Sequence, residues 1–109
     1  MRTKPVVPRA RANRDVETAI DFYLAQGGEA AALRFLDALE RAYAFIARHP
    51  GAGSPRYAYE LDLPGLRCWR LRRSPYLVFT VERDDRIDVW RVLHGERDIP
   101  ASMNEAETP

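Results

Sequence analysis

The chain has 109 residues, which is enough for one domain with a single modest core and too few for two. Its 17 Lys and Arg residues nearly balance its 16 Asp and Glu residues, and the net charge of +1 argues against a protein whose affinity comes mainly from coating nucleic-acid phosphates. The single cysteine, Cys68, excludes an intrachain disulfide, and with two distant histidines it does not make a tetrahedral zinc site, so we expect neither metal nor cofactor.

The N-terminal residues are basic but contain no apolar core segment, so they do not predict a signal peptide. No apolar run approaches the length that a membrane-spanning helix needs. We therefore expect a cytoplasmic protein that does not associate with membranes.

The first half of the chain predicts a short strand followed by a helical hairpin. Residues 4–10 read as an edge strand, because the two prolines in it cannot donate hydrogen bonds to a neighbouring strand. Apolar residues then recur with helical spacing over residues 12–26 and again over residues 29–49. Gly27-Gly28 separates the two helices, which are expected to fold back on each other.

Each predicted helix has an apolar face and a polar face. In the first helix, Asp15 falls among the polar residues opposite the apolar face. In the second, Phe35, Leu39 and Ile46 lie on one stripe, and we expect them to be buried between the hairpin and a sheet.

The second half of the chain predicts strands. Residues 57–63 are consistent with a brief strand. Three further strands are predicted at residues 66–71, 76–82 and 87–94. Their short connections demand antiparallel neighbours, so the fold class is α+β: an N-terminal strand, an antiparallel helical hairpin, then a three-to-four-stranded antiparallel sheet packed on the helices. We assign residues 1–100 to this single domain and expect residues 101–109 to form a disordered tail.

Four stretches of the sequence carry a family resemblance: ANRDVETAIDFY, ARHPGAGSPR, LPGLRCWRLRRSPYLVFTV and IDVWRVLHGERDIP. In this order they resemble the RelE/ParE superfamily of small bacterial toxins, the ParE-like branch in particular, and the resemblance covers residues 4–100. It implies one of two activities. RelE-type toxins cleave messenger RNA in the ribosome, whereas ParE-type toxins poison DNA gyrase, and an antitoxin encoded alongside neutralises either kind.

The residues that the resemblance would assign to a nuclease are mostly missing. Cleaving RNA through its 2′-hydroxyl needs a base, an acid and charge stabilisation at the phosphate. Carried over by register, two arginines of RelE-like nucleases become Leu77 and Gly95, the late tyrosine falls near Ala101, and one strand lysine becomes Cys68. A second strand lysine is kept in charge as Arg70.

A polar cluster near the C-terminus is a candidate substitute for that machinery. If the protein is a nuclease, Arg91, His94 and Arg97 are its catalytic residues, and histidine titrates in a range that suits acid–base work. Strand alternation, however, puts Trp90, Val92 and His94 on one face and Arg91 on the other. We interpret His94 as the residue that ends the strand and hydrogen-bonds to the backbone, and we assign no catalytic residue.

Two groups of residues are candidates for binding. The candidates for contact with the target lie in or beside the C-terminal segment and are Trp90, His94, Arg97 and Ile99. The candidates for contact with the antitoxin are Phe22, Leu33, Arg67, Trp69, Arg70, Arg72 and Arg73. The four arginines of this second group could hold an acidic antitoxin segment or could equally form a solvated strand face and turn, and alternation separates Arg67 from Arg70 and Arg72. Phe22 and Leu33 are apolar residues on the outer face of the hairpin, which an antitoxin helix could cover.

The sequence therefore predicts a ParE-like toxin of a type II toxin–antitoxin system that inhibits DNA gyrase by binding it and is not an enzyme. A ParD-like antitoxin is the expected partner in a hetero-oligomer, and direct nucleic-acid binding is not expected outside the target complex. The alternatives are a ribosome-dependent endoribonuclease of RelE type and a toxin-derived interaction module that has lost toxicity.

Overall fold

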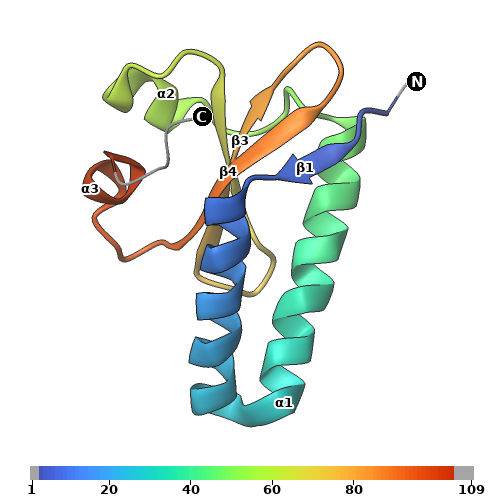
Figure 1. The fold of residues 1–109 in the computed structure, drawn as a ribbon, viewed down its shortest axis with the longest axis vertical. Helices are drawn as coiled ribbons and strands as arrows, with labels where there is room; N and C mark the ends of the chain where they lie inside the picture. The colour runs from blue at the N-terminus through green and yellow to red at the C-terminus, as the bar shows by residue number, and fades with distance from the viewer. Residues whose placement is uncertain (1–2, 105–109) are drawn as a thin grey trace.

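The computed structural model describes residues 3–104 and has an α+β architecture, as the sequence predicts. A four-stranded sheet forms the centre of the molecule, and a long helical hairpin packs against one of its faces (Figure 1). Two short helices cover the opposite face. Among the described residues, none of the helices combines the length and the apolar character needed to span a membrane.

The helical hairpin is a single element, α1 (Ala10–Arg48), that is sharply kinked at Gly28. Gly28 has φ 76° and ψ −166°, a backbone conformation that glycine adopts far more readily than residues with a side chain. The kink divides α1 into a first arm, residues 10–27, and a second arm, residues 29–48, which run antiparallel (Figure 1). The predicted hairpin is therefore confirmed, and its first arm begins two residues earlier than predicted.

The strands have the order β1-β4-β3-β2 in the sheet. Their bounds are β1 (Val6–Pro8), β2 (Leu66–Arg70), β3 (Tyr76–Glu82) and β4 (Ile87–His94). β2, β3 and β4 form the expected antiparallel meander, and β1 is the expected short edge strand. β1 runs parallel to β4, however, so the sheet is only mostly antiparallel. The proline-containing edge strand covers only the first three residues of β4, from Ile87 to Val89.

Two segments differ from the sequence-based expectation. Residues 57–63 were predicted as a strand, but α2 (Arg56–Leu61) is a helix, because Tyr57, Ala58 and Leu61 also have the spacing of one helical face and pack on the sheet. The tail predicted at residues 101–109 begins inside α3 (Ile99–Asn104). The carboxylate of Asp98 accepts a hydrogen bond from the Ala101 amide, which caps this helix, and residues 105–109 lie outside the described part of the chain.

Each face of the sheet has its own apolar core. On the hairpin side, Phe35, Leu39 and Ile46 are buried against the sheet, which confirms the predicted helix face. On the far side, strand residues such as Phe79 pack under α3, whose Met103 is buried. The far-side core therefore depends on the residues that follow β4.

A β-bulge in β4 changes which residues share a face. Phe79 pairs with Arg91 while Thr80 pairs with Val89, so Trp90 is the extra residue. Trp90 packs with the far-side core, whereas Val92 packs on the hairpin side. The expectation that Trp90, Val92 and His94 lie on one face is therefore wrong, because simple alternation does not hold across a bulge.

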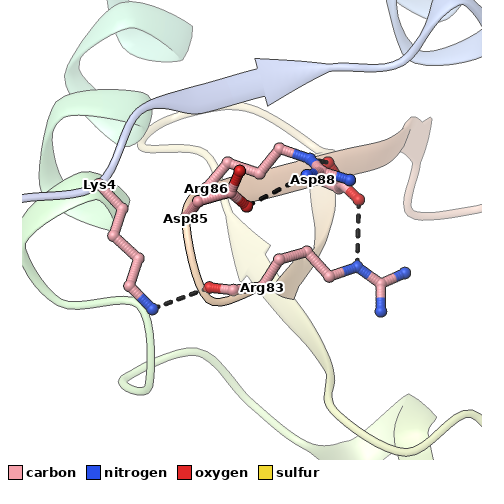
Figure 2. A network of polar contacts seen from close by, with 5 residues as sticks. All are labelled: Lys4, Arg83, Asp85, Arg86 and Asp88. Carbon is pink, nitrogen blue, oxygen red and sulfur yellow. Dashed lines mark hydrogen bonds and ion pairs between the residues drawn. The ribbon is translucent and has the colours of Figure 1, made fainter.

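A polar network closes the β3–β4 turn and ties the N-terminal segment to it (Figure 2). The carboxylate of Asp88, which is only 4% exposed, accepts hydrogen bonds from Arg86 Nε at 2.7 Å and from Arg83 Nε at 3.2 Å. Lys4 Nζ donates to the Arg83 carbonyl at 2.8 Å. Burial alone would raise the pKa of Asp88, but the hydrogen bonds from the two arginines outweigh it and lower that pKa below its usual value.

Candidate functional site: an arginine groove and the C-terminal segment

A groove of about 1310 Å³ opens between the second arm of α1 and the edge of the sheet at β2. It exists because the hairpin packs mainly over β4 and β1, so the part of this face near β2 is left uncovered. Leu33 and Phe45 line it from the second arm, where they are 57% and 45% exposed. Trp69 lines it from β2, with its ring edge-to-face against Phe45 at 6.0 Å. These side chains give the groove apolar walls.

The polar part of the lining is almost entirely arginine. On the second arm, Arg34, Arg41 and Arg48 recur every seven residues, so they lie along one side of the helix. From β2 and the β2–β3 turn (residues 71–75) come Arg70, Arg72 and Arg73. Among the described residues that line the groove, Asp37 is the single acid, and Arg41 Nε already donates to it at 2.8 Å. We call this feature the arginine groove.

The arginines of this groove differ from the other described arginines in their partners. The structure records no side-chain hydrogen bond, ion pair or ring contact within residues 3–104 for Arg34, Arg48, Arg70, Arg72 and Arg73. Most of the other described arginines have such a contact, for example Arg56 with Glu60 at 3.3 Å. These five arginines all line the groove, so this surface combines apolar walls with positive charge that is not paired within the described residues.

The β2–β3 turn is held firmly beside the hairpin. Tyr23 and Ser74 share a hydrogen bond of 2.8 Å between their hydroxyl oxygens, and Ser74 Oγ also accepts the Tyr76 amide at 3.2 Å. The Tyr23 ring stacks on Phe35 at 5.2 Å. Arg73 has φ 57°, a left-handed conformation that costs energy in a residue with a side chain. The groove is therefore bordered by a fixed turn.

The C-terminal part of β4 is anchored by a buried ion pair. Arg91 is fully buried, and its Nε and Nη2 donate to the two carboxylate oxygens of Asp15 at 2.7 Å and 2.9 Å. Its Nη1 donates to the Ser102 carbonyl, and the Val92 amide donates to Asp15 at 3.0 Å. Arg91 thus joins α1, β4 and α3.

Asp15 was predicted to lie on a polar helix face, and this is wrong because it is buried. Since β1 ends at Pro8, it does not reach the backbone of β4 beyond Val89. The Asp15 carboxylate takes the place of a neighbouring strand by accepting the Val92 amide. A satisfied backbone donor and a paired guanidinium together explain why a carboxylate is buried here.

The C-terminal candidates for the target do not form one site. His94 Nδ1 accepts the Glu96 amide at 3.1 Å, which confirms its interpretation as a strand-ending residue bonded to backbone. Its ring contacts Tyr76 and Phe22 on the hairpin side, whereas Trp90 packs on the far side under the Arg9 guanidinium. Ile99 is buried in the far-side core, so it is not available for contact in this conformation. Of these candidates, only Arg97 is exposed.

The family follows from comparison with known proteins. A family model described as "ParE toxin of type II toxin-antitoxin system, parDE" matches residues 6–99. The chain belongs to the ParE toxin family.

The fold supports the same relationship. A chain of the solved structure described as "Chromosomal ParDE TA system from P. aeruginosa" superposes with a TM-score of 0.70 at 20% sequence identity. The superposition covers 84% of this chain and 96% of that chain. No curated protein sequence is significantly similar to this chain. The ParE-like fold is thereby established.

The antitoxin-binding candidates predicted for this ParE-family chain divide into two groups. Leu33, Trp69, Arg70, Arg72 and Arg73 meet in the arginine groove although alternation alone separates some of them, because β2 is an edge strand that ends beside the groove. Arg67 lies outside the groove and donates to the Gly53 carbonyl at 3.2 Å. Phe22 also lies outside it, packed on His94.

Sequence reasoning missed the arginines of the second arm, Arg34, Arg41 and Arg48. Their seven-residue spacing was the available signal, because it places them on one side of the predicted helix. The other polar groups of the described residues suggest no nucleophile and no metal site. Burial raises the pKa of the Cys68 thiol to about 11, which makes it a poor nucleophile, and no three His, Cys, Asp or Glu side chains within residues 3–104 gather to hold a metal ion.

Proposed function

We propose that this type II toxin inhibits DNA gyrase by binding it, without catalytic residues of its own, and that a ParD-like antitoxin neutralises it in a hetero-oligomer. Membership of the ParE family supports the choice of target. The observation that carries the non-catalytic part is the burial of Arg91, which is fully enclosed and already bound to Asp15. A guanidinium in that position has no free donor edge toward a scissile phosphate, so the cluster of Arg91, His94 and Arg97 loses its central cation.

The arginine groove is the proposed antitoxin site. The groove has a volume of about 1310 Å³, and its helix wall from Arg34 to Arg48 is roughly 21 Å long at 1.5 Å per residue, so a helix of about four turns can lie along it. Such a helix would complete the layer that the hairpin leaves open over β2, with its apolar face on Leu33, Phe45 and Trp69. This is the helix-in-groove mode of recognition.

The antitoxin segment is expected to be disordered when free and to order in the groove. Ordering on binding buries apolar surface that is hydrated in both free partners, so calorimetry should give a large negative heat-capacity change. Binding as a preformed rigid domain, with only a small heat-capacity change, would contradict this part of the proposal.

The target-facing element is proposed to be the exposed part of the segment from Val92 to Pro100, where Arg97 is exposed. Truncation after Arg91 is not a clean test of this idea. It would remove the buried Leu93, Ile99 and Met103 together with the Ser102 carbonyl that Arg91 binds, so the fold would be lost with the segment. Arg97→Ala is the better probe, because the side chain is exposed.

The deciding experiment measures supercoiling by purified gyrase and messenger integrity in a translating extract, with the same protein preparation. We expect loss of supercoiling with accumulation of cleaved DNA, intact messenger RNA, and little change in His94→Ala. Codon-specific messenger cleavage that disappears in His94→Ala would identify an endoribonuclease instead. A folded protein that is inert in both assays would indicate an interaction module without toxicity.

A further inference from the structure

We infer that the arginine groove selects its occupant by charge, and that the occupant is an amphipathic helix with acidic side chains on both flanks of its apolar stripe. This inference rests on the proposed antitoxin site and adds the chemistry by which the partner is recognised. It concerns two sets of residues. The helix bank is Arg34, Arg41 and Arg48, and the turn bank is Arg70, Arg72 and Arg73.

The helix bank has a regular spacing. Seven residues make almost two turns, so its members follow one another along the second arm at intervals of about 10.5 Å, and the row spans roughly 21 Å. A helix lying along this arm has the same rise per residue. Acidic residues that recur about every seven positions on one flank would therefore meet this bank in register.

The turn bank lies on the opposite wall. Arg70 ends β2, and Arg72 and Arg73 belong to the β2–β3 turn that Ser74 and Tyr23 fix beside the hairpin. Its three arginines are close in sequence rather than spaced along an axis. An occupant between the walls thus meets positive charge on both sides, and apolar side chains between them.

Solvation alone does not account for this distribution of charge. The groove lining holds six arginines and one aspartate in a chain whose net charge is only +1. Like charges around a concave surface repel one another, while five of these arginines have no contact with an acid in the described part of the chain. Several arginines outside the groove pair with nearby acids, as Arg83 and Arg86 do with Asp88. An acidic partner removes the repulsion and supplies the missing counter-charges.

The test uses the full chain and three synthetic helical peptides of about 15 residues that share one Leu/Ala stripe. The flanking positions carry Glu in the first peptide, Gln in the second and Lys in the third. Dissociation constants are measured by fluorescence anisotropy at low and high salt. We expect the Glu peptide to bind at least about tenfold more tightly than the Gln peptide at low salt, with the advantage shrinking at high salt, and the Lys peptide to bind weakest.

Three variants that each remove one positive charge locate the effect. Arg48→Gln tests the helix bank, Arg72→Gln tests the turn bank, and Arg56→Gln is the matched control, because Arg56 lies on α2 and pairs with Glu60. Both bank variants should weaken binding of the Glu peptide severalfold and leave the Gln peptide unchanged, while the control changes neither. Equal binding of the Glu and Gln peptides, or equal weakening by Arg56→Gln and Arg48→Gln, would overturn the inference.

The result is separable from that of the proposed function. If the groove selects acidic peptides but the protein does not inhibit gyrase, the proposed target is wrong and this inference stands. A ParD-like antitoxin encoded beside the toxin could bind wild type, Arg48→Gln and Arg72→Gln equally well. That result would support the antitoxin as partner but would refute selection by charge.

Discussion

Two regions of the molecule use arginine in opposite ways. At the end of β4, Arg91 is completely buried and its donors are satisfied by Asp15 and the Ser102 carbonyl. In the arginine groove, Arg48 and Arg72 are exposed and have no recorded partner within the described residues. In the first region, the chain itself supplies the partners of the guanidinium. In the second, under the inference drawn above, another molecule supplies the acids.

This difference predicts which charged residues stabilise the fold and which do not. Removing one member of a buried pair leaves an isolated charge in a medium of low polarity, which is strongly destabilising. Removing an exposed charge without a partner leaves nothing unsatisfied. Substitutions in the two regions should therefore separate folding from binding.

The largest effect is expected for Asp15→Ala. It leaves the buried Arg91 guanidinium and the Val92 amide without their acceptor, so the free energy of unfolding should fall by about 3–5 kcal/mol. Urea denaturation measures the loss. Asp37→Ala is the matched control, because it breaks the exposed pair with Arg41 and should cost less than about 1 kcal/mol. Equal losses in the two variants would remove the distinction between the regions.

A second comparison uses two leucines of the second arm, one buried and one exposed. Leu39 is 6% exposed in the hairpin-side core, and Leu39→Ala should cost about 2–5 kcal/mol. Leu33 lies in the groove wall, 57% exposed, and Leu33→Ala should change the free energy of unfolding by less than about 0.5 kcal/mol. Thermal unfolding of both variants checks the helix faces, and a cost below about 0.5 kcal/mol for Leu39→Ala would show that they are wrongly assigned.

A smaller effect, with a pH signature, is expected at Asp88. Its pKa is lowered in the folded protein, so its stabilising contribution is present above its unfolded pKa of about 4 and is lost as the pH falls through the folded pKa. Asp88→Asn should cost about 1–2 kcal/mol at pH 7, less than Asp15→Ala because Arg83 and Arg86 are nearly half exposed. The urea midpoints of wild type and Asp88→Asn should therefore converge as the pH falls through the folded pKa of Asp88. A difference that widens as the pH falls would contradict this assignment.

The smallest effect on stability belongs to the groove itself. Arg48→Gln and Arg72→Gln should each leave the free energy of unfolding within about 0.5 kcal/mol of wild type. Differential scanning calorimetry is sufficient to detect a larger change. A loss above about 1 kcal/mol in either variant would mean that these arginines hold the fold together and are not reserved for a partner.

Much of the fold was predictable because its signals are local. Helical spacing around Phe35, Leu39 and Ile46 predicted the second arm, and Gly28 marked the kink. The strand at residues 57–63 was wrong because a short run such as Tyr57 to Leu61 fits both periodicities, and packing against the sheet decides between them.

The site was only half predictable, for a different reason. Trp69 and the arginines near it were visible as a cluster in sequence. The burial of Asp15 was not, because it follows from how far β1 reaches along β4. The structure records no ion pair for Arg34 or Arg48 within the described residues, and this too depends on the tertiary arrangement.

The position of β4 between β1 and β3 also predicts an order of folding. The hairpin can form early from contacts close in sequence, but Val6 pairs with Ile87, and Asp15 meets Arg91 across 76 positions of the chain. Closing so long a loop is entropically costly, so we expect these pairings to form after the hairpin. On this expectation, one wall of the arginine groove belongs to the hairpin, which forms first, and the other belongs to the sheet, which forms later. A collapsed intermediate with both helical arms formed would have no groove, and binding of a partner would report the completed fold.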